Sequence, residues 1–484
     1  MLKIALINPK KTKKHIASAA PPINLGILAS YLRKQVGSQI EIRIIDGLAG
    51  QNIEAELLKW QPELIGITST TPTVLEAYRL VDWIKNNLKS LVVMGGVHAS
   101  VLPEEALKHV DIVIVGEGEL AFLEIAQKSI AHESMKDKII ARPYLTNLDE
   151  IPSPAWDLMD LEFYIAADDN TAKTIPYTSA VSRAITLISS RGCPYHCIFC
   201  HNSWLPTPVR YHSAERVIEE LNFLNSKYGI NSFFFADDEF LVNRDRLNKI
   251  CQMLIDTGLN EKITWCCQAR SDVIERMGVE GLKLIKQAGC NLIAIGFESG
   301  SQRVLDILEK SLKLKSHQNA LLICQEASLK VSGSFMFGTP GETKEDMLET
   351  VTFINSNRKR MDLAGIGIAT PYPGTKLWRI CEERGLFNKE IKYDDLCPDP
   401  RFGLREDRIF CDTMTKKEFI EFFRSTQDQM RENNLSRSLN AGRYAPSALI
   451  KLFSSHPLYV IKYFFKYPKK SISLFSRFFK KLSE

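Results

Sequence analysis

The first 192 residues contain no cysteine, and all 11 cysteines of the 484-residue chain follow them. An odd number of cysteines, confined to the later part of a long chain, is not the pattern of a secreted disulfide-bonded domain. Long hydrophobic runs are also missing, because no apolar stretch approaches the roughly 18 residues that cross a bilayer. The N-terminal residues place an apolar run before basic residues, the reverse of a secretory signal. We therefore expect a cytoplasmic protein whose reduced thiols are available to bind metal.

The chain also lacks a strong excess of one sign of charge. Its 62 Lys and Arg against 57 Asp and Glu leave a formal net charge of +5, which is too small for this length to indicate a nucleic-acid-binding protein. Hydrophobic residues make up 45% of the chain, and no repeat or low-complexity tract occurs. These features exclude disordered and fibrous classes. The length fits about three domains.

Residues 1–135 lack the GxGxxG pattern, which argues against a nicotinamide or flavin dinucleotide site. Short β-branched runs alternate there with helical patterns at 24–35 and 73–88. Continuous apolar strands separated by helices predict a doubly wound α/β domain with a parallel sheet. The predicted strands are 4–8, 40–46, 64–68, 91–96 and 111–119.

Small and polar residues lie at the carboxyl ends of the predicted strands of this first domain or directly after them. In a doubly wound sheet the ligand lies beyond the carboxyl ends of the strands. We therefore expect a ligand site at these residues, with ordinary turn chemistry as the alternative. The residues are Thr68, Ser69, Thr70, Gly95, Gly96, Gly116, Glu117 and Gly118.

A linker is predicted at 136–180, where the prolines of IPSPAW (151–156) favour an extended path. Six βα-type units follow in 181–400, and without two more to close an eight-fold ring they predict an open, partial barrel. Residues 401–484 form a helical C-terminal region, with predicted helices at 416–435 and 446–484. The strands predicted for the barrel are 185–190, 232–237, 263–268, 291–297, 332–338 and 365–370.

Cys193, Cys197 and Cys200 lie on the loop after the first strand of the second domain. This is the catalytic end of a barrel-like sheet. Three thiolates can converge on one metal centre, and the missing fourth would leave one iron of a cubane cluster open to a small molecule. A zinc site completed by His196, His201 or a distant cysteine is the alternative.

This cysteine loop and the strand ends after it resemble the radical S-adenosylmethionine (SAM) superfamily, over about residues 180–400. The CxxxCxxC spacing is followed in order by DDEF (237–240), QAR (268–270), GFESGS (296–301), FMFGTPGET (335–343) and PYPGT (371–375). The resemblance implies a partial (β/α)6 barrel in which the three cysteines hold a 4Fe-4S cluster that cleaves SAM. The residues that it assigns to SAM are Asp237, Asp238, Arg270, Glu298, Ser299, Gly338, Pro340 and Gly341.

Some of these residues also fit simpler roles. Gly338 to Gly341 fit a tight turn between a strand and a helix, and Asp237 and Asp238 fit a solvated loop or a helix cap. The other eight cysteines show no ligand spacing, and most of them are expected to be buried. Cys266 and Cys267 are adjacent on a strand, so one of them can face the barrel interior, where a catalytic thiol is an open alternative.

The first domain resembles the cobalamin-binding domain that is joined to many radical SAM enzymes. The matching segments are PPINLGILASYLRK (21–34), STTPT (69–73), GGVHAS (95–100) and VGEGE (115–119). This resemblance assigns the small and polar strand-end residues to cobalamin. The DxHxxG motif is missing, and His98 is expected to be a polar loop residue rather than an axial ligand. The second cysteine triplet of the related tRNA methylthiotransferases is missing too.

The two resemblances together imply a cobalamin-dependent radical SAM methyltransferase, in which one SAM supplies the methyl group and a second SAM the adenosyl radical. The expected substrate is a small molecule with an unactivated carbon, such as a lipid, an isoprenoid or a tetrapyrrole. A reduced flavodoxin or ferredoxin is the expected electron donor. Radical cyclisation or rearrangement without methyl transfer stays open, as does a non-enzymatic cobalamin carrier or sensor, against which the intact cysteine triplet argues.

The basic residues of the chain gather at its C-terminus. Residues 451–484 contain eight Lys or Arg, one Glu and nine Phe or Tyr, so the remainder is nearly neutral. Basic residues interleaved with aromatic ones favour peripheral contact of 446–484 with an anionic inner membrane face. An RNA-binding tail and a helix packed on the barrel are the alternatives.

Overall fold

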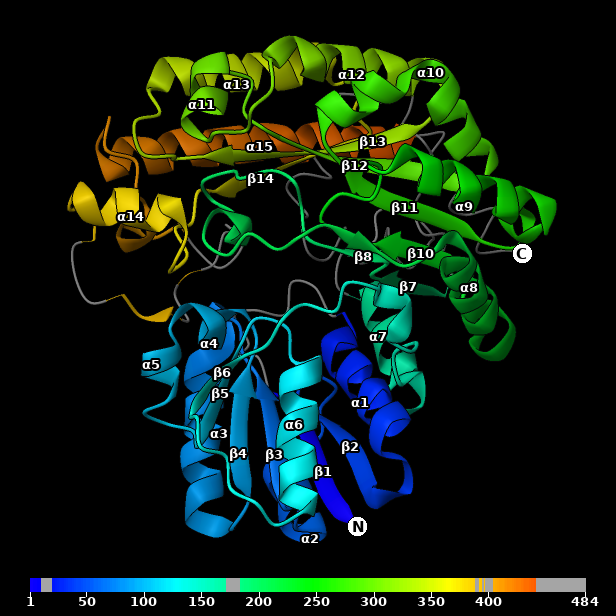
Figure 1. Cartoon of the computed structure of the whole chain (residues 1–484). Helices are drawn as coiled ribbons and strands as arrows, with labels where there is room; N and C mark the ends of the chain where they lie inside the picture. Colours follow the sequence, from blue (N-terminus) through cyan, green and yellow to red (C-terminus); the bar gives the residue numbers. More distant parts are fainter. Residues whose placement is uncertain (10–19, 171–182, 388–390, 394–395, 397–403, 441–484) are drawn as a thin grey trace, which may run out of the picture.

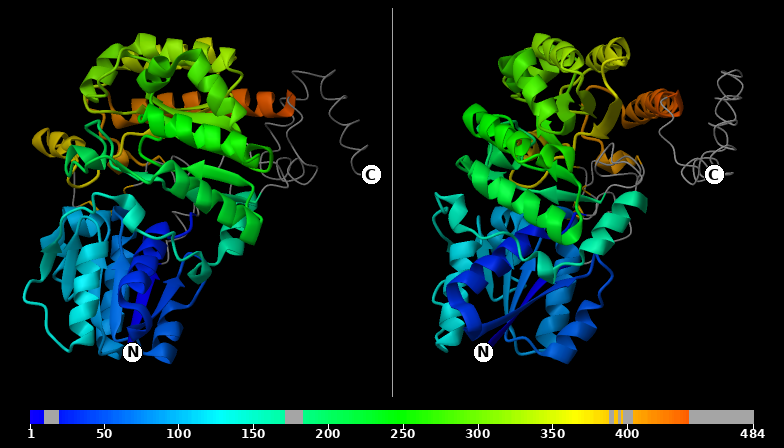
Figure 2. Two further views of the ribbon diagram at one scale, coloured as in Figure 1. Left: turned by 45° about the vertical axis from the view of Figure 1, so that its right-hand side comes forward. Right: turned by 90° about the vertical axis from the view of Figure 1, so that its right-hand side faces the viewer.

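The computed structural model describes residues 1–9, 20–170, 183–387, 391–393, 396 and 404–440. Two α/β units lie one above the other, an arrangement seen in Figure 1 and in the turned views of Figure 2. The strands of the N-terminal sheet point towards the second unit, so their carboxyl ends lie at the junction of the two (Figure 1). Both sheets therefore contribute to one region, where ligands of parallel sheets bind.

The N-terminal sheet is entirely parallel, with the order β2-β1-β3-β4-β5-β6. The five predicted strands are confirmed, and a sixth short strand, β6, pairs with β5 at the edge. β6 lies in the stretch that the sequence assigned to the linker, so the sheet continues past residue 135. The strands are β1 (Leu2–Asn8), β2 (Ile40–Asp46), β3 (Leu64–Thr68), β4 (Leu91–Gly95), β5 (Ile112–Val115) and β6 (Ile139–Ala141).

Helices cover both faces of this sheet, because each helix carries one apolar stripe that must be buried. On one face, α1 (Ile23–Val36) and α6 (Glu119–Ile130) pack through residues such as Leu25, Leu32 and Phe122. On the other face, α2 (Ile53–Trp60) and α3 (Val74–Asn87) form a second core. Two short helices, α4 (Val97–Val101) and α5 (Pro103–Ala106), follow β4.

The second sheet is parallel with the order β14-β13-β12-β11-β10-β7, and its two outer strands, β14 and β7, are not paired with each other. It is therefore an open, partial barrel, which confirms the predicted fold. The six predicted strands are confirmed as β7 (Ala184–Leu187), β10 (Ser232–Phe235), β11 (Thr264–Ala269), β12 (Cys290–Glu298), β13 (Lys330–Phe337) and β14 (Leu363–Ile368).

The helices of the second unit lie outside the curved sheet (Figure 1). Their apolar residues join those of the strands in the largest core of the protein. They are α8 (Ala214–Tyr228), α9 (Arg244–Asp256), α10 (Ser271–Gln287), α11 (Gln302–Ile307), α12 (Leu314–Glu326), α13 (Lys344–Asn357) and α14 (Lys376–Glu383), and α7 (Leu161–Asn170) precedes the sheet.

The two adjacent cysteines of β11 point to opposite faces of the sheet, as predicted. Cys267 belongs to the large core shared with the outer helices. Cys266 belongs to a separate cluster, with Ala184 and Leu292, that contains strand residues alone. Cys266 therefore faces the concave side of the barrel sheet.

The C-terminal helix α15 (Lys416–Asn440) confirms the helix predicted at 416–435. Its Phe419 and Phe423 are fully buried against the barrel sheet, where Phe423 meets Phe337 edge to face. The predicted helix at 446–484 lies outside the described residues. Within the described part of the chain, no helix is long and apolar enough to cross a membrane.

Candidate functional site

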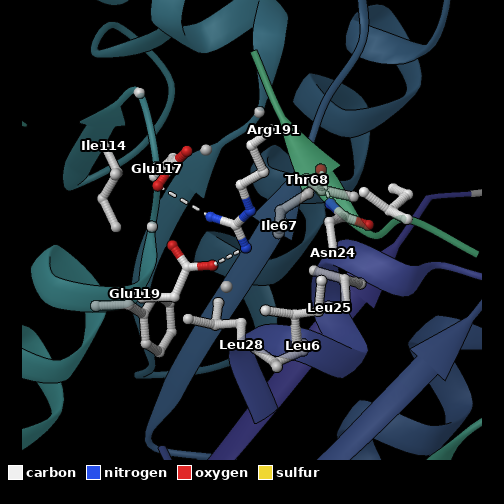
Figure 3. Close-up of a pocket in the computed structure, with 18 of the residues that line it drawn as sticks. Leu6, Asn24, Leu25, Leu28, Ile67, Thr68, Ile114, Glu117, Glu119 and Arg191 are labelled. Atoms are coloured by element: carbon white, nitrogen blue, oxygen red, sulfur yellow. Dashed lines mark hydrogen bonds and ion pairs between the residues drawn. The ribbon is translucent and has the colours of Figure 1, made fainter. Parts of the chain in front are cut away.

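A cavity of about 390 Å³ lies between the two units, at the carboxyl ends of the N-terminal strands (Figure 3). Most of its wall comes from β1, β3, β4, α1 and the turn after β5. The second unit contributes residues that follow β7 and β10, among them Arg191, Gly192 and Asp238. A cavity of this size is in the range of small-molecule sites.

Apolar side chains form much of the cavity wall, and several polar groups stand among them. Leu6, Leu25, Leu28 and Ile114 belong to the apolar part, and the buried Glu119 lies near Leu28 (Figure 3). At the rim, the Asn24 amide donates a hydrogen bond of 3.0 Å to the Thr68 hydroxyl. An apolar wall with a few convergent polar groups is typical of a site for an organic ligand.

The rim brings together most of the residues that the sequence assigned to cobalamin. Gly96 has φ 95°, and a Cβ atom there would lie 2.5 Å from the Ser69 carbonyl oxygen, so only glycine fits. Ser69 and Thr70 form the supporting turn and are not part of the wall. The assigned residues that line the cavity are Thr68, Gly95, Gly96, Gly116, Glu117 and Gly118. This wall fits a bulky cofactor approaching the backbone closely, and the individual contacts remain predictions.

His98 lies behind this wall and does not line the cavity. Its ring is 1% exposed, with Nδ1 3.2 Å from the Thr71 hydroxyl and Nε2 3.5 Å from Glu105. Burial lowers the pKa of this imidazole. These contacts match the expected polar role rather than that of an axial ligand.

An ion-pair cluster forms one side of the cavity (Figure 3). Arg191 donates from Nη1 to Glu117 at 2.9 Å and from Nη2 to Glu119 at 2.6 Å. Arg210 also binds Glu117, through Nη1 at 3.0 Å and through Nη2. Nothing in the sequence indicated either arginine, because an arginine beside a cysteine motif has no pattern of its own. Glu119 lies in the quoted VGEGE segment but was not assigned to the site. Glu117, assigned to cobalamin, is thus held by the second unit.

The three cysteines stand on the loop that follows Arg191, and no described cysteine forms a disulfide. Cys197 is buried, whereas Cys193 and Cys200 are partly exposed. Among the described residues, no three His, Cys, Asp or Glu side chains are close enough to bind one metal ion. The three thiols lie on one loop and none forms a disulfide, so each can bind a different iron of a cubane cluster.

Arg270 contacts this loop through Cys197 and Tyr195. Its Nη1 lies 3.7 Å from the Cys197 sulfur, its Nε donates to Asp272 at 3.0 Å, and its guanidinium lies 3.6 Å from the centre of the Tyr195 ring. The residue assigned to SAM is therefore next to the cluster ligand. Its nitrogens already have protein acceptors.

The three acidic residues after β10 differ in their burial and in their contacts. Asp237 is buried and accepts hydrogen bonds from the backbone and hydroxyl groups of Ser189 and from the Ser190 hydroxyl. Asp238 is exposed and lines the cavity. Glu239 is buried, and burial raises its pKa to about 7.

Two carboxylate oxygens in this acidic stretch have no hydrogen-bond partner among the described residues. They are Oδ2 of Asp237 and Oε1 of Glu239, both buried. Buried acceptors without a donor are costly, and the amino group of SAM is a donor of the required kind. The stretch therefore fits SAM. Glu239, inside the quoted DDEF motif, is a candidate beside the predicted Asp237, because each acid carries its hydrogen bonds on one oxygen and leaves the other oxygen free.

Glu298 and Ser299, assigned to SAM at the end of β12, differ in their surroundings. Glu298 has φ 61° and accepts a hydrogen bond of 2.8 Å from the buried Lys310. Ser299 is fully buried and shares a 3.0 Å hydrogen bond with Thr350 of α13. Ser299 thus joins the sheet to an outer helix.

The segment from Gly338 to Glu342 forms a closed turn between β13 and α13. The Glu342 carboxylate accepts from the backbone N–H groups of Gly338 at 2.6 Å and Thr339 at 3.0 Å. A Cβ atom on Gly338 would lie 2.9 Å from the Phe419 ring. Gly338 leaves room for α15, and Pro340 is buried in the same turn. These contacts favour the role of a tight turn between strand and helix. A SAM contact by Gly338, Pro340 or Gly341 remains a prediction.

Comparison with known families and proteins agrees with both parts of the site. Residues 187–354 match the Radical SAM superfamily, and residues 10–126 match the B12 binding domain. An uncharacterised methyltransferase of Pyrococcus horikoshii is 34% identical over 403 residues, which cover 78% of this chain and 83% of that protein.

A more distant relative and a solved structure extend this comparison. The anaerobic magnesium-protoporphyrin IX monomethyl ester cyclase of Cereibacter sphaeroides is 25% identical, and the match covers 79% of this chain and 64% of that protein. The cobalamin-dependent S-adenosylmethionine radical enzyme OxsB, solved with aqua-cobalamin and S-adenosylmethionine bound, superposes with a TM-score of 0.69 at 20% identity. That match covers 100% of this chain and 75% of OxsB, and it shows the same fold.

Proposed function

The chain belongs to the radical SAM superfamily, among members that also carry a B12 binding domain, and from this premise we propose that it methylates an unactivated carbon of a small molecule. Its cofactors are a 4Fe-4S cluster, SAM and cobalamin. When bound, they supply an adenosyl radical that removes hydrogen from carbon and a methyl group for transfer.

The observation that supports methyl transfer most strongly is the shared cavity. Its wall contains the glycine turns of the B12 binding domain and also Arg191 and Gly192, which immediately precede the cysteine loop. Methyl transfer to a substrate radical requires both cofactors to reach one carbon atom. A carrier or sensor of cobalamin would not need the cysteine loop at this position.

The side chains of this protein contribute binding, orientation and exclusion of water. Cys193, Cys197 and Cys200 hold the iron, and the buried acid Glu239 accepts from the amino group of SAM. The apolar residues around Leu6 and Leu25 exclude water from their side of the cavity. A dry enclosure protects a radical from side reactions.

We further propose that the substrate is apolar and bulky, in the class of lipids, isoprenoids or tetrapyrroles. The relative from Cereibacter sphaeroides is named for a tetrapyrrole substrate, which supports this class. A reduced flavodoxin or ferredoxin is the proposed electron donor.

Anaerobic reconstitution tests the proposal. The chain is loaded with iron, sulfide and cobalamin, reduced, and given SAM with a deuterated methyl group and candidate substrates. A product heavier by one deuterated methyl group, together with 5′-deoxyadenosine, is the expected result. Cys197→Ala should abolish both products. A product lighter by two hydrogens would instead identify a cyclase, and cleavage of SAM without cobalamin binding would refute methyl transfer.

For residues 446–484 we propose peripheral contact with an anionic membrane, on the basis of their interleaved basic and aromatic residues alone. Full-length protein is expected to cosediment with vesicles containing phosphatidylglycerol, and a chain that ends at residue 445 is expected to stay in solution. Equal cosedimentation of the two proteins would refute the membrane proposal. Binding of RNA in place of vesicles would favour the alternative.

A further inference from the structure

The carboxylate of Glu117 accepts hydrogen bonds from two arginines of the other unit. Arg191 reaches Oε2 at 2.9 Å, and Arg210 reaches Oε2 at 3.0 Å and also Oε1. Glu117 lies on the turn between β5 and α6, whose two flanking glycines, Gly116 and Gly118, line the cofactor cavity. One side chain of the B12 binding domain thus engages two residues of the barrel.

The two arginines mark the two ends of the cysteine loop. Arg191 lies on β8 (Ser190–Arg191) and Arg210 on β9 (Arg210–Tyr211), and the two residues face each other in an antiparallel pair. The cysteines lie between them, at 193, 197 and 200. The loop is closed at its base by Gly192, where a Cβ atom would lie 2.5 Å from the Thr207 carbonyl oxygen. The position of Glu117 therefore fixes both ends of the loop.

The contact is largely shielded from solvent, and Arg210 has further partners. The side chains of Arg210 and Glu117 are 7% and 17% exposed. Arg210 also donates to the Leu145 carbonyl oxygen at 2.6 Å, and its guanidinium lies 4.9 Å from the Tyr144 ring centre. A buried charge pair of this kind is strongly orienting, because removal of one partner leaves the other charge unpaired.

The same side chains form part of the cavity wall. Glu117, Glu119 and Arg191 all line the cavity, whereas Arg210 lies behind them. A ligand that fills the cavity contacts Glu117 and Arg191 directly. A change in the position of Glu117 is passed to the cysteine loop through Arg191, which contacts Glu117 and lies at the start of that loop.

We propose that Glu117 is a positioning residue that couples the two cofactor sites, so that occupation of the cobalamin cavity favours the arrangement of the cysteine loop that binds the cluster. The coupling is reciprocal by thermodynamic linkage, so the assembled cluster also tightens cobalamin binding. The inference needs the two cofactors of the proposed function but no particular substrate. Failure of methyl transfer alone would leave it intact.

The test compares cobalamin affinity in full-length protein with and without the cluster. Hydroxocobalamin is titrated anaerobically and followed by its visible spectrum, and iron and sulfide contents confirm the loading. The wild-type dissociation constant is expected to be at least about 5-fold lower with the cluster, at the lower end of typical coupling. In Glu117→Gln, which keeps the shape but removes the charge, the two constants are expected to be equal within 2-fold.

Glu124→Gln is the matched control. Glu124 lies on α6, close along the chain to Glu117, and pairs with Arg142 at 2.6 Å within the B12 binding domain. This variant is expected to keep the wild-type ratio of constants. Arg210→Gln removes the barrel's side of the same contact. In this variant the dissociation constants with and without the cluster are expected to be equal within 2-fold, as in Glu117→Gln. A wild-type ratio of one, or equal ratios in wild type and both variants, would overturn the proposal.

Discussion

At the scale of single residues, the backbone positions that tolerate no side chain define the cofactor cavity. Gly96 has φ 95° and would place a Cβ atom 2.5 Å from a carbonyl oxygen. Gly118 lies on the same rim with φ −90° and no atom within 4 Å of a Cβ position. Two glycines of one cavity thus differ in whether glycine is required.

Gly96→Ala is expected to lower the free energy of unfolding by about 2 kcal/mol, because a residue with a Cβ atom is strained in this conformation. Gly118→Ala is expected to change it by less than about 0.5 kcal/mol. Urea unfolding, followed by circular dichroism, measures both. Equal losses in the two variants would contradict the distinction between them.

A second residue-scale prediction concerns Arg270, whose cation lies 3.7 Å from the Cys197 sulfur. A positive charge and a hydrogen bond at a cluster ligand favour the reduced, more negative cluster. Arg270→Gln is therefore expected to lower the reduction potential of the cluster, measured by redox titration with electron paramagnetic resonance.

Arg276→Gln provides the control for that measurement. Arg276 also contacts Asp272 and the Tyr195 hydroxyl, each at 3.0 Å, whereas the contact with the cluster ligand Cys197 is made by Arg270. The reduction potential of the cluster in Arg276→Gln is expected to stay at the wild-type value. If both variants shifted the potential equally, the effect would come from Asp272 or Tyr195 rather than from the Arg270 charge.

At the scale of elements, the turn between β13 and α13 contains a buried acid. Burial raises the pKa of Glu342 to about 8, whereas an unfolded chain has the usual value of 4.5. Between these values the folded protein binds more protons than the unfolded one. The free energy of unfolding must therefore fall as the pH rises from about 5 to 8, by at most about 1.4 kcal/mol per pH unit.

Glu342→Gln is expected to remove this part of the pH dependence. The midpoint of urea unfolding should differ less between pH 6 and pH 8 in the variant than in the wild type, both without cofactors. Glu349→Gln, at an exposed position of α13, should behave as the wild type does. An unchanged pH dependence in Glu342→Gln would show that other groups titrate.

Elements with long apolar runs were predictable, and short ones were not. The run LIGIT defined β3 to the residue, whereas β6 has three residues and is an edge strand. β8 and β9 have two residues each and contain Arg191 and Arg210, so no apolar pattern marks them. Both arginines contact Glu117, a carboxylate far away in the chain.

The residues of the candidate site also include some that the sequence predicts and some that it does not. The cysteines and the glycine turns were predictable, because their chemistry needs particular residues at particular spacings. Ser299 was assigned to SAM by its motif, but it is buried against Thr350. Contacts between elements separated in sequence, such as Thr350 with Ser299, are set by packing and leave no local pattern.

At the scale of the whole molecule, the barrel also reaches the B12 binding domain through Tyr393. Its hydroxyl donates to Glu105 at 2.7 Å, and its ring lies 4.8 Å from the His98 ring centre. Tyr78 of α3 donates to the same carboxylate at 3.2 Å. Glu105 thus joins segments of both units.

Tyr393→Phe is expected to lower the free energy of unfolding by about 1 kcal/mol, since one partly buried hydrogen bond is lost. Amide hydrogen exchange should become faster in α5, which contains Glu105, and in the preceding helix α4. It should stay unchanged in α8 and α9. Uniform acceleration across the chain would instead indicate a general loss of stability.

The arginine contacts at Glu117 carry a consequence for the order of folding. Glu117 and Arg210 are separated by 93 positions in the chain, and contacts over such distances form late because the closure of a long loop is entropically unfavourable. The strand pairs within each unit, such as β1 with β3 and β7 with β10, join segments that are closer together along the chain, so we expect them to form earlier. We therefore expect the cysteine loop to reach its final shape only after both units have folded and docked, and iron loading to be one of the last steps in the maturation of this protein.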